Sequence, residues 1–294
     1  MIHNRTNVKQ NEFQTGKEES IQFMTYSRKR SMNPHVPAGF VPKGRTWNNG
    51  FWIQSSTTGY FYVWIPVGSL QENGTIDGVR FCHQFGRRNF QNDDFTKYGY
   101  HEYSQNFMQQ YKSIEKYGGF YLSKYIVSLD LSTGNPTLRR GKKNIIPMIN
   151  LSFHQAMKIA QNMEKSETVH SHIPYGVEYD SVLEWLLESG IKTPREILED
   201  SSSWGNYKDA EESPQKLKKT GSRENFWSAM GIADLAGNTG EWTQERHGEL
   251  GIQGVIRGGD CYQRGIDFPV SVRRLHNPRH KNQAIGFRVA LWMR

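Results

Sequence analysis

Hydrophobic residues recur with a helical spacing only in the middle third of the chain. After Ser152, apolar residues return every three or four positions, which predicts an amphipathic helix. Ser152 and Gln155 have the spacing of a capping box, in which two side chains satisfy the free amides at the start of a helix. A second helix is predicted from Ser181 to a stop at Gly190, and the pair Thr193-Pro194 predicts the start of a third.

Runs of β-branched and aromatic residues predict strands on both sides of these helices. From about residue 200 the helical spacing fades, and turn-forming residues become frequent. We therefore predict one α+β domain, with helices in the middle and a long irregular half that short strands hold together. The four predicted strands are 59–68, 118–129, 254–259 and 285–292.

Two segments lack any clear periodicity. Residues 1–35 are polar and mixed in charge, and they are predicted to form an N-terminal arm outside a domain at 36–294. Residues 71–116 are predicted to be an insertion within that domain. The first residues lack the apolar region of a signal peptide, and no stretch approaches the roughly 20 apolar residues of a membrane helix. We therefore expect synthesis in the cytoplasm and no membrane partner.

The chain has a formal net charge of +8, and much of it lies near the C-terminus. Residues 257–294 hold eight Arg or Lys against two Asp, so 8 − 2 leaves +6 there. This excess favours a surface for an anionic ligand. Arg257 and Arg288 stand near glycines in predicted strands, and for them a structural role as hydrogen-bond donors is favoured. A second basic run, at 138–144, is predicted to be a solvated loop.

Six segments of the sequence occur in the order seen in one known family: YGGFYLSKY (117–125), PMINLSFHQAMKIA (147–160), IPYGVEYDSVLEWL (173–186), GIADLAGNTGEWT (231–243), VIRGGD (255–260) and AIGFRVAL (284–291). With these segments the chain resembles the formylglycine-generating enzyme, or sulfatase-modifying factor, family, whose fold is a variant of the C-type lectin fold. This resemblance implies a loop-rich α+β fold with short antiparallel strands and two to three helices. Three other segments, PAGFVPKG, YVWIPV and SWGNY, resemble a subgroup carried by prophages of Gram-positive bacteria.

The resemblance provides a test for copper chemistry. Copper-dependent members use two cysteines five residues apart, shortly after an RGG motif. Counted from that motif at 257–259, the two positions hold Gln263 and Phe268, and neither side chain replaces a thiolate as a Cu(I) ligand. Cys261 is interpreted either as a lone reactive thiol or, preferably, as a small buried residue after a strand. We therefore expect no copper.

Iron-dependent members of the family rely on a separate site of three histidines. His276 and His280 are four residues apart, and His170 and His172 are two apart. The first pair encloses a proline and lacks a following carboxylate, and the second precedes a proline as a turn or strand would. We expect no iron.

The stretch DLAGNTGEWT has the composition of a calcium-binding turn. Its carboxylates and the carbonyls exposed by its glycines are oxygen ligands, which calcium prefers. The resemblance implies a structural calcium site here. The alternative is a metal-free turn, in which the glutamate caps amides and Trp242 fills the core. The implied calcium ligands are the side chains of Asp234 and Glu241 and the carbonyls of Gly237 and Thr239.

The segment 260–283 combines aromatic, arginine, asparagine and histidine side chains, which suit recognition of a glycan or a protein. The predicted surface residues are Tyr262, Arg264, Arg273, Arg274, His276, Asn277, Arg279 and His280.

The favoured hypothesis is a non-catalytic binding protein, encoded by a phage or prophage, that serves in receptor binding or virion display. Its ligand would be a cell-surface glycan or protein, either neutral or anionic. The arm would attach it to a virion or tail protein, and copies would form a homo-oligomer. The alternative is a formylglycine-generating oxidase, or another non-haem metalloenzyme, with a displaced active site. Binding to nucleic acid is not favoured, because the charge is modest and no motif for it is present.

Overall fold

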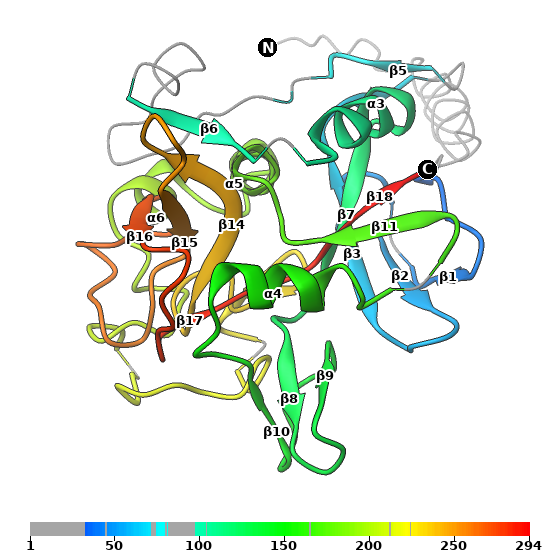
Figure 1. Cartoon of the computed structure of the whole chain (residues 1–294). Coiled ribbons are helices and arrows are strands. Elements are labelled where there is room, and N and C mark those ends of the chain that lie inside the picture. The colour runs from blue at the N-terminus through cyan, green and yellow to red at the C-terminus, as the bar shows by residue number, and fades with distance from the viewer. Residues whose placement is uncertain are drawn as a thin grey trace, which may run out of the picture. The chain divides into compact units, whose positions relative to one another are not determined.

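A six-stranded antiparallel sheet lies at the centre of the compact unit Asn33–Arg294 (Figure 1). The computed structural model describes residues 33–294 except 45, 72–74, 80, 82–97, 104, 165, 212 and 224. The strand order in this sheet is β1-β2-β3-β7-β18-β11. In that order the strands are Phe40–Pro42, Trp52–Ser55, Phe61–Pro66, Gly119–Ser123, Ala290–Met293 and Val169–His172.

The central strands of this sheet are apolar because both of its faces are buried. In β3, Tyr62 and Trp64 pack into one hydrophobic cluster, whereas Val63 and Ile65 pack into another. Successive side chains of a strand point to opposite faces, so a strand covered on both sides is a continuous apolar run. The run predicted at 59–68 is therefore confirmed as a buried strand.

A second sheet is built around the long strand β14, Gly240–His247. Its order is β16-β15-β14-β17, and β6 also pairs with β14. The stretch predicted as a metal-binding turn thus runs into the longest described strand. The other strands of this sheet are β6 (Tyr100–Glu102), β15 (Gln253–Arg257), β16 (Arg274–His276) and β17 (Ile285–Gly286).

Three smaller sheets complete the strands of the described residues. The three-stranded sheet β10-β8-β9 extends away from the rest at the lower end of Figure 1. Its strands and those of the two short hairpins are β8 (Ser128–Asp130), β9 (Asn135–Thr137), β10 (Ile145–Pro147), β4 (Ser69–Leu70), β5 (Ile76–Asp77), β12 (Ser228–Ala229) and β13 (Ile232–Ala233).

Four helices occur among the described residues: α3 (Phe107–Tyr117), α4 (Phe153–Ala160), α5 (Gly176–Glu188) and α6 (Pro194–Leu198). The capping boxes predicted at Ser152 and Thr193 are both present. The second predicted helix begins earlier than expected, at Gly176 rather than Ser181, because its first turns are buried on all sides and show no amphipathic spacing.

Helix α3 was not predicted. It lies within 71–116, a segment whose residues 82–97 are outside the described part. Its buried face includes Gln110 and Ser113 as well as Ile114, so polar residues interrupt the apolar stripe that a sequence pattern detects. The predicted arm lies outside the described residues up to position 32.

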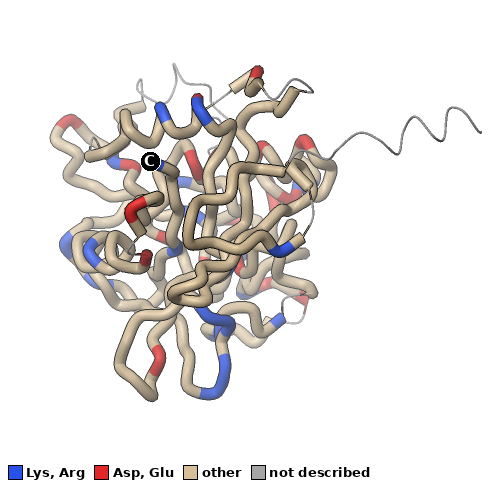
Figure 2. The backbone as a smooth tube through the Cα atoms, turned by 90° about the vertical axis from the view of Figure 1, so that its right-hand side faces the viewer, with Lys and Arg blue, Asp and Glu red and all other residues tan. Residues whose placement is uncertain are grey.

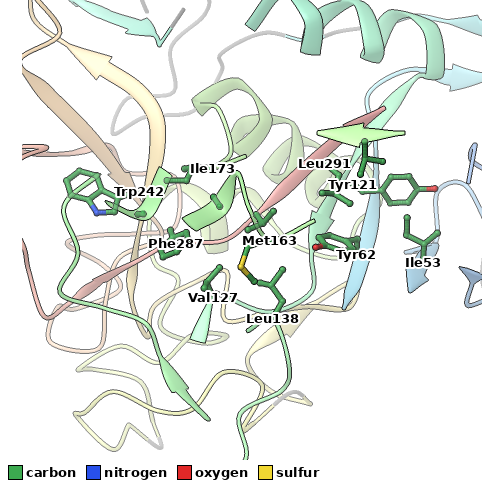
Figure 3. Close-up of a cluster of buried hydrophobic side chains, with 14 of the residues drawn as sticks. Ile53, Tyr62, Tyr121, Val127, Leu138, Met163, Ile173, Trp242, Phe287 and Leu291 are labelled. Atoms are coloured by element: carbon green, nitrogen blue, oxygen red, sulfur yellow. The ribbon is translucent and has the colours of Figure 1, made fainter. Parts of the chain in front are cut away.

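One hydrophobic cluster connects the two larger sheets (Figure 3). Ile53, Tyr62 and Leu291 come from the six-stranded sheet, and Trp242 comes from β14. The indole of Trp242 is 1% exposed and donates a hydrogen bond from Nε1 to the carbonyl of Leu151, at 3.3 Å. The core therefore fixes β14, and with it the loops that leave the second sheet.

Candidate functional site

Beneath the C-terminal loops lies a cluster of four buried charged residues, which we call the ion-pair core: Asp180, Glu245, Arg257 and Arg273. The Asp180 carboxylate accepts one hydrogen bond from Arg257, at 2.7 Å, and another from Arg273, at 2.5 Å. Arg273 also donates from Nε to Glu245, at 2.5 Å, and Arg257 Nη1 lies 3.6 Å from the same carboxylate. All four side chains are at most 2% exposed. Charges so deeply buried are tolerated only when they are paired.

The ion-pair core fixes both ends of one long loop. Arg257 is the last residue of β15, and Arg273 immediately precedes β16. Because both arginines donate to Asp180 on helix α5, the chain between them leaves and returns at a common anchor. No sequence pattern predicts Asp180 or Glu245 as partners of these arginines, although each carboxylate lies in a segment that is largely buried.

Between these anchors the loop exposes a small mixed surface. Tyr262 is 55% exposed and Ile266 is 56% exposed. Arg264 is also exposed, and it forms a bidentate pair with Asp267 at 2.7 and 2.9 Å. The backbone below them is held from outside the loop, since the amide of Gly265 donates to Asp209 at 2.8 Å.

The following segment extends this surface toward β16. Arg274 pairs with Asp260, at 2.7 Å, and so ties the segment to the first loop. The ring of His276 lies 5.7 Å from that of Trp242, and burial together with the nearby Arg274 lowers the pKa of His276. The side chains of Asn277, Arg279 and His280 are exposed.

Arg273 is the exception among the eight predicted surface residues. Its side chain is 2% exposed and bonded to two carboxylates. The prediction that Arg273 lies on a ligand-binding surface is therefore wrong. A guanidinium can serve a surface or a buried ion pair equally well, and only the tertiary position of Asp180 and Glu245 decides between them.

Comparison with known proteins identifies this architecture. The family model of the sulfatase-modifying factor enzyme 1-like domain matches residues 62–292, which is more than half of the chain. The chain belongs to this family. The predicted family and its C-type-lectin-like α+β fold are thereby confirmed.

Solved structures resemble the chain at low sequence identity. Treponema denticola variable protein 1 is 14% identical with a TM-score of 0.47, over 85% of this chain and 98% of that one. PvdO from Pseudomonas aeruginosa is 17% identical with a TM-score of 0.45, over 60% and 81%. The U1 variant of a major tropism determinant is 11% identical with a TM-score of 0.39, over 86% and 61%. The search of the curated proteins gives no significant match. Similarity at this level carries no argument about function.

Within this family fold, the positions considered for copper lie in the loop that the ion-pair core anchors. Gln263 and Phe268 are both partly buried. Cys261 is fully buried, and burial together with the neighbouring Asp260 raises the pKa of its thiol to about 11. A thiol with so high a pKa stays protonated at neutral pH, so it is a poor nucleophile. The interpretation of Cys261 as a small buried residue is confirmed, while Cys82 lies outside the described residues.

His170 and His172 both have structural contacts. The ring centroid of His170 lies 5.1 Å from that of Trp292, and burial lowers the pKa of His170 to about 4. His172 Nε2 lies 2.9 Å from the buried carboxylate of Glu178. Within the described ranges, no group of three or more His, Cys, Asp or Glu side chains is arranged to hold a metal ion.

The two carboxylates predicted to bind calcium accept hydrogen bonds from protein groups in the arrangement observed. Both oxygens of Glu241 accept hydrogen bonds from Arg288, each at 2.6 Å. One oxygen of Asp234 accepts from Thr220 and from the amide of Gly221. The other oxygen of Asp234 has no hydrogen-bond partner among the described residues, whereas the guanidinium of Arg288 neutralises the charge of Glu241 and so disfavours a cation at that carboxylate. The calcium site, including the carbonyls of Gly237 and Thr239, stays a prediction.

Arg288 is a structural residue, as the glycines around it predicted. Besides Glu241, it donates hydrogen bonds to the carbonyl oxygens of Ser123, at 3.2 Å, and Ala233, at 3.1 Å. It is fully buried and joins β14 to the six-stranded sheet. Its contact with Glu241 neutralises the carboxylate that the calcium hypothesis required.

Among the described residues, none of the helices has both the length and the hydrophobicity of a membrane-spanning segment.

Proposed function

We propose that the chain is a non-catalytic binding protein, which recognises its ligand with the C-terminal loops. The observation that carries this proposal is the combination of a rigid base with an exposed, chemically mixed surface. The ion-pair core fixes residues 257–273 at both ends, while Tyr262, Arg264 and Ile266 remain exposed. A surface held rigid before binding loses little conformational entropy when a ligand arrives.

The chemistry of the exposed side chains supports a glycan or protein ligand. Tyr262 offers a ring face together with a hydroxyl, and Arg279 and His280 offer hydrogen-bond donors. Tyrosine and arginine are the residue types most often found at the energetic centres of interfaces. The buried, protonated thiol of Cys261 supports a role without redox chemistry.

A finer proposal follows from the resemblance to prophage-encoded members. The chain would act in receptor binding or display on a virion, attached through residues 1–35 and presented in several copies. Several copies raise the overall affinity without stronger single contacts, which suits a weak glycan ligand.

The test is an array of cell-surface glycans and cell-wall polymers probed with the wild-type protein and two double variants. Tyr262→Ala/Arg279→Ala removes one exposed aromatic and one exposed arginine from the C-terminal loops. Met108→Ala/Arg195→Ala removes one exposed apolar residue and one exposed arginine elsewhere. We expect the first variant to lose the array signal and the second to keep it. Equal signals from both variants would contradict the proposal.

A copper titration addresses the enzymatic alternative directly. We expect no stoichiometric Cu(I) binding, because Gln263 and Phe268 stand at the positions of the copper-binding cysteines and Cys261 is buried. Tight Cu(I) binding that Cys261→Ser abolishes would restore the oxidase hypothesis.

A further inference from the structure

The loop between β9 and β10, which we call the basic loop (residues 138–144), concentrates positive charge in a way that the proposed function does not use. Its four cationic residues are Arg139, Arg140, Lys142 and Lys143, and all four are exposed. Blue segments gather at the lower edge of Figure 2, where Figure 1 shows the three-stranded sheet. No carboxylate of the described residues forms an ion pair with Arg139, Lys142 or Lys143.

This loop is not a freely solvated turn, because it is fastened at its ends and in its middle. Leu138 at one end is fully buried, and at the other end the carbonyl of Asn144 accepts from the amide of Leu131, at 2.8 Å. Between them, the amide of Gly141 donates to Thr220, at 2.9 Å. A Cβ added to Gly141 would lie 2.4 Å from the Cβ of Lys219, so the two segments are in direct contact.

Side chains add to the attachment between the basic loop and residues 219–221. Arg140 Nε donates to the carbonyl of Gly221, at 2.9 Å, and Lys219 Nζ donates to that of Lys143, at 3.1 Å. Residues 220 and 221 are in turn bonded to the buried carboxylate of Asp234. The fold thus holds four like charges close together, and their mutual repulsion falls when an anion binds among them.

An open pocket of about 790 Å³ lies against this loop. All four cations line it, and Asp130 is its only acidic lining residue. That aspartate is engaged by the backbone, since one of its oxygens accepts from the amide of Ser132 at 2.9 Å. The pocket therefore has both the volume for a sugar-sized group and a strongly positive wall.

The remaining lining residues combine polar groups with the apolar side chains of Phe61 and Ile145, a mixture that suits a sugar ring with hydroxyl groups and apolar C–H faces. Gln54, Ser132 and Asn144 are neutral hydrogen-bonding residues placed among the cations. Tyr125 is 5% exposed and offers little of its ring face to a ligand in this pocket.

A second, smaller hollow of about 310 Å³ shares Arg140 with the first and adds Arg223 and Phe226. The guanidinium of Arg223 lies 4.9 Å from the ring centroid of Phe226, which is 64% exposed. The cationic wall therefore continues beyond one pocket, as a linear ligand with repeated negative charges would require.

We propose that the basic loop and the two hollows beside it form a second binding site, which takes a chain of an acidic polysaccharide. Arginines bind sulfate, phosphate or carboxylate groups with two parallel hydrogen bonds, and lysines bind them as point charges. This site shares no residue with the C-terminal surface, so it stands whether or not that surface binds a ligand.

The experiment measures binding of four labelled probes by fluorescence anisotropy: dextran sulfate, polygalacturonate, unsubstituted dextran and a single-stranded oligodeoxynucleotide. The test variant is Arg139→Glu/Lys142→Glu/Lys143→Glu. The control, Lys112→Glu/Lys158→Glu/Arg195→Glu, changes the net charge equally at exposed positions elsewhere. Thermal unfolding of each protein verifies that it is folded.

We expect wild type and control to bind at least one acidic polysaccharide and not dextran. The test variant should bind it at least about tenfold more weakly, and the salt dependence of its binding should be shallower. A preference for dextran sulfate would identify sulfate-like or phosphate-like groups, and a preference for polygalacturonate would identify carboxylates.

Three results would overturn the proposal. The first is equal weakening in both variants, which would show only an effect of net charge. The second is tighter binding of the oligonucleotide than of either acidic polysaccharide. The third is the absence of binding by the wild-type protein to both acidic polysaccharides.

Discussion

The C-terminal segment 257–294 and the basic loop 138–144 are both rich in cations, but the fold uses these charges in opposite ways. Of the eight Arg and Lys residues in the C-terminal segment, three are buried and two more are paired with aspartates. In the basic loop, all four cations are exposed. A count of charges along the sequence predicts a surface for an anionic ligand in the first region, whereas the cations of the second region are the ones that are all exposed.

The difference arises from where the carboxylates lie. Asp180, Glu241 and Glu245 are buried under the C-terminal segment, so the arginines that reach them turn inward. The surface that remains there is mixed, with Tyr262 and Ile266 beside a few charges. Recognition by the C-terminal loops is therefore expected to depend on shape and aromatic contact more than on net charge.

The largest expected effect in this comparison comes from Arg273. Arg273→Met leaves Asp180 and Glu245 buried with fewer partners, and removing one partner of a buried ion pair costs about 3–5 kcal/mol of the free energy of unfolding. The exposed Arg279 provides the matched control, because Arg279→Met should change stability by no more than about 0.5 kcal/mol. Urea unfolding followed by tryptophan fluorescence measures both. Similar small losses in the two variants would show that the buried pairs are not structural.

A pH-dependent effect is expected at Asp234, which supports the segment under the basic loop. Burial raises its pKa from 3.8 to about 6 in the folded protein. A folded state that binds a proton more tightly is favoured at low pH, so this contribution is complete below about pH 4 and is lost as the pH rises through about 6. The change amounts to something on the order of 3 kcal/mol.

The Asp234→Asn variant isolates that contribution. Asparagine keeps an oxygen for the hydroxyl of Thr220 and the amide of Gly221, but it does not titrate. The stability of wild type relative to the variant should therefore fall between pH 4 and pH 7 in a series of urea titrations. A difference that is constant with pH, or that rises, would contradict the raised pKa.

How much of this could be predicted from the sequence depended on whether the deciding contact was local. The helix starts at Ser152 and Thr193 were predictable, because a capping box is closed within four residues. Helix α3 was not, because buried Gln110 and Ser113 obscure its apolar stripe. The fold itself was predictable from the order of the six family segments, without a prediction for each helix and strand.

The candidate site was harder to predict, because its contacts are distant in sequence. Arg273 and Arg274 are adjacent and identical, yet the first is buried against Asp180 and the second is partly exposed beside Asp260. Nothing within several residues of either distinguishes them. In the same way, the basic loop was interpreted as solvated because its anchors, residues 219–221, follow it by almost 80 positions.

Neutralising the basic loop should stabilise the protein slightly, whereas the substitution of Arg273 should destabilise it. Arg139→Gln/Lys142→Gln/Lys143→Gln removes repulsion among exposed charges and breaks no ion pair among the described residues. We expect the free energy of unfolding to rise by about 0.5 kcal/mol at low salt, with the gain disappearing at high salt because exposed charges are then screened. A loss of stability would mean that these side chains hold the loop in place, and the loop would then resemble the C-terminal segment.

The smallest expected effect is that of a calcium chelator on thermal stability. Because Arg288 already occupies both oxygens of Glu241, removal of calcium should leave the unfolding midpoint unchanged, and added calcium should not raise it. Differential scanning calorimetry with EGTA, then with excess calcium or magnesium, measures this. A midpoint that falls with EGTA and recovers with calcium alone would show that the ion displaces Arg288 from Glu241. The guanidinium would then keep only its carbonyl partners, and Arg288→Met would be expected to cost less stability with calcium than without it.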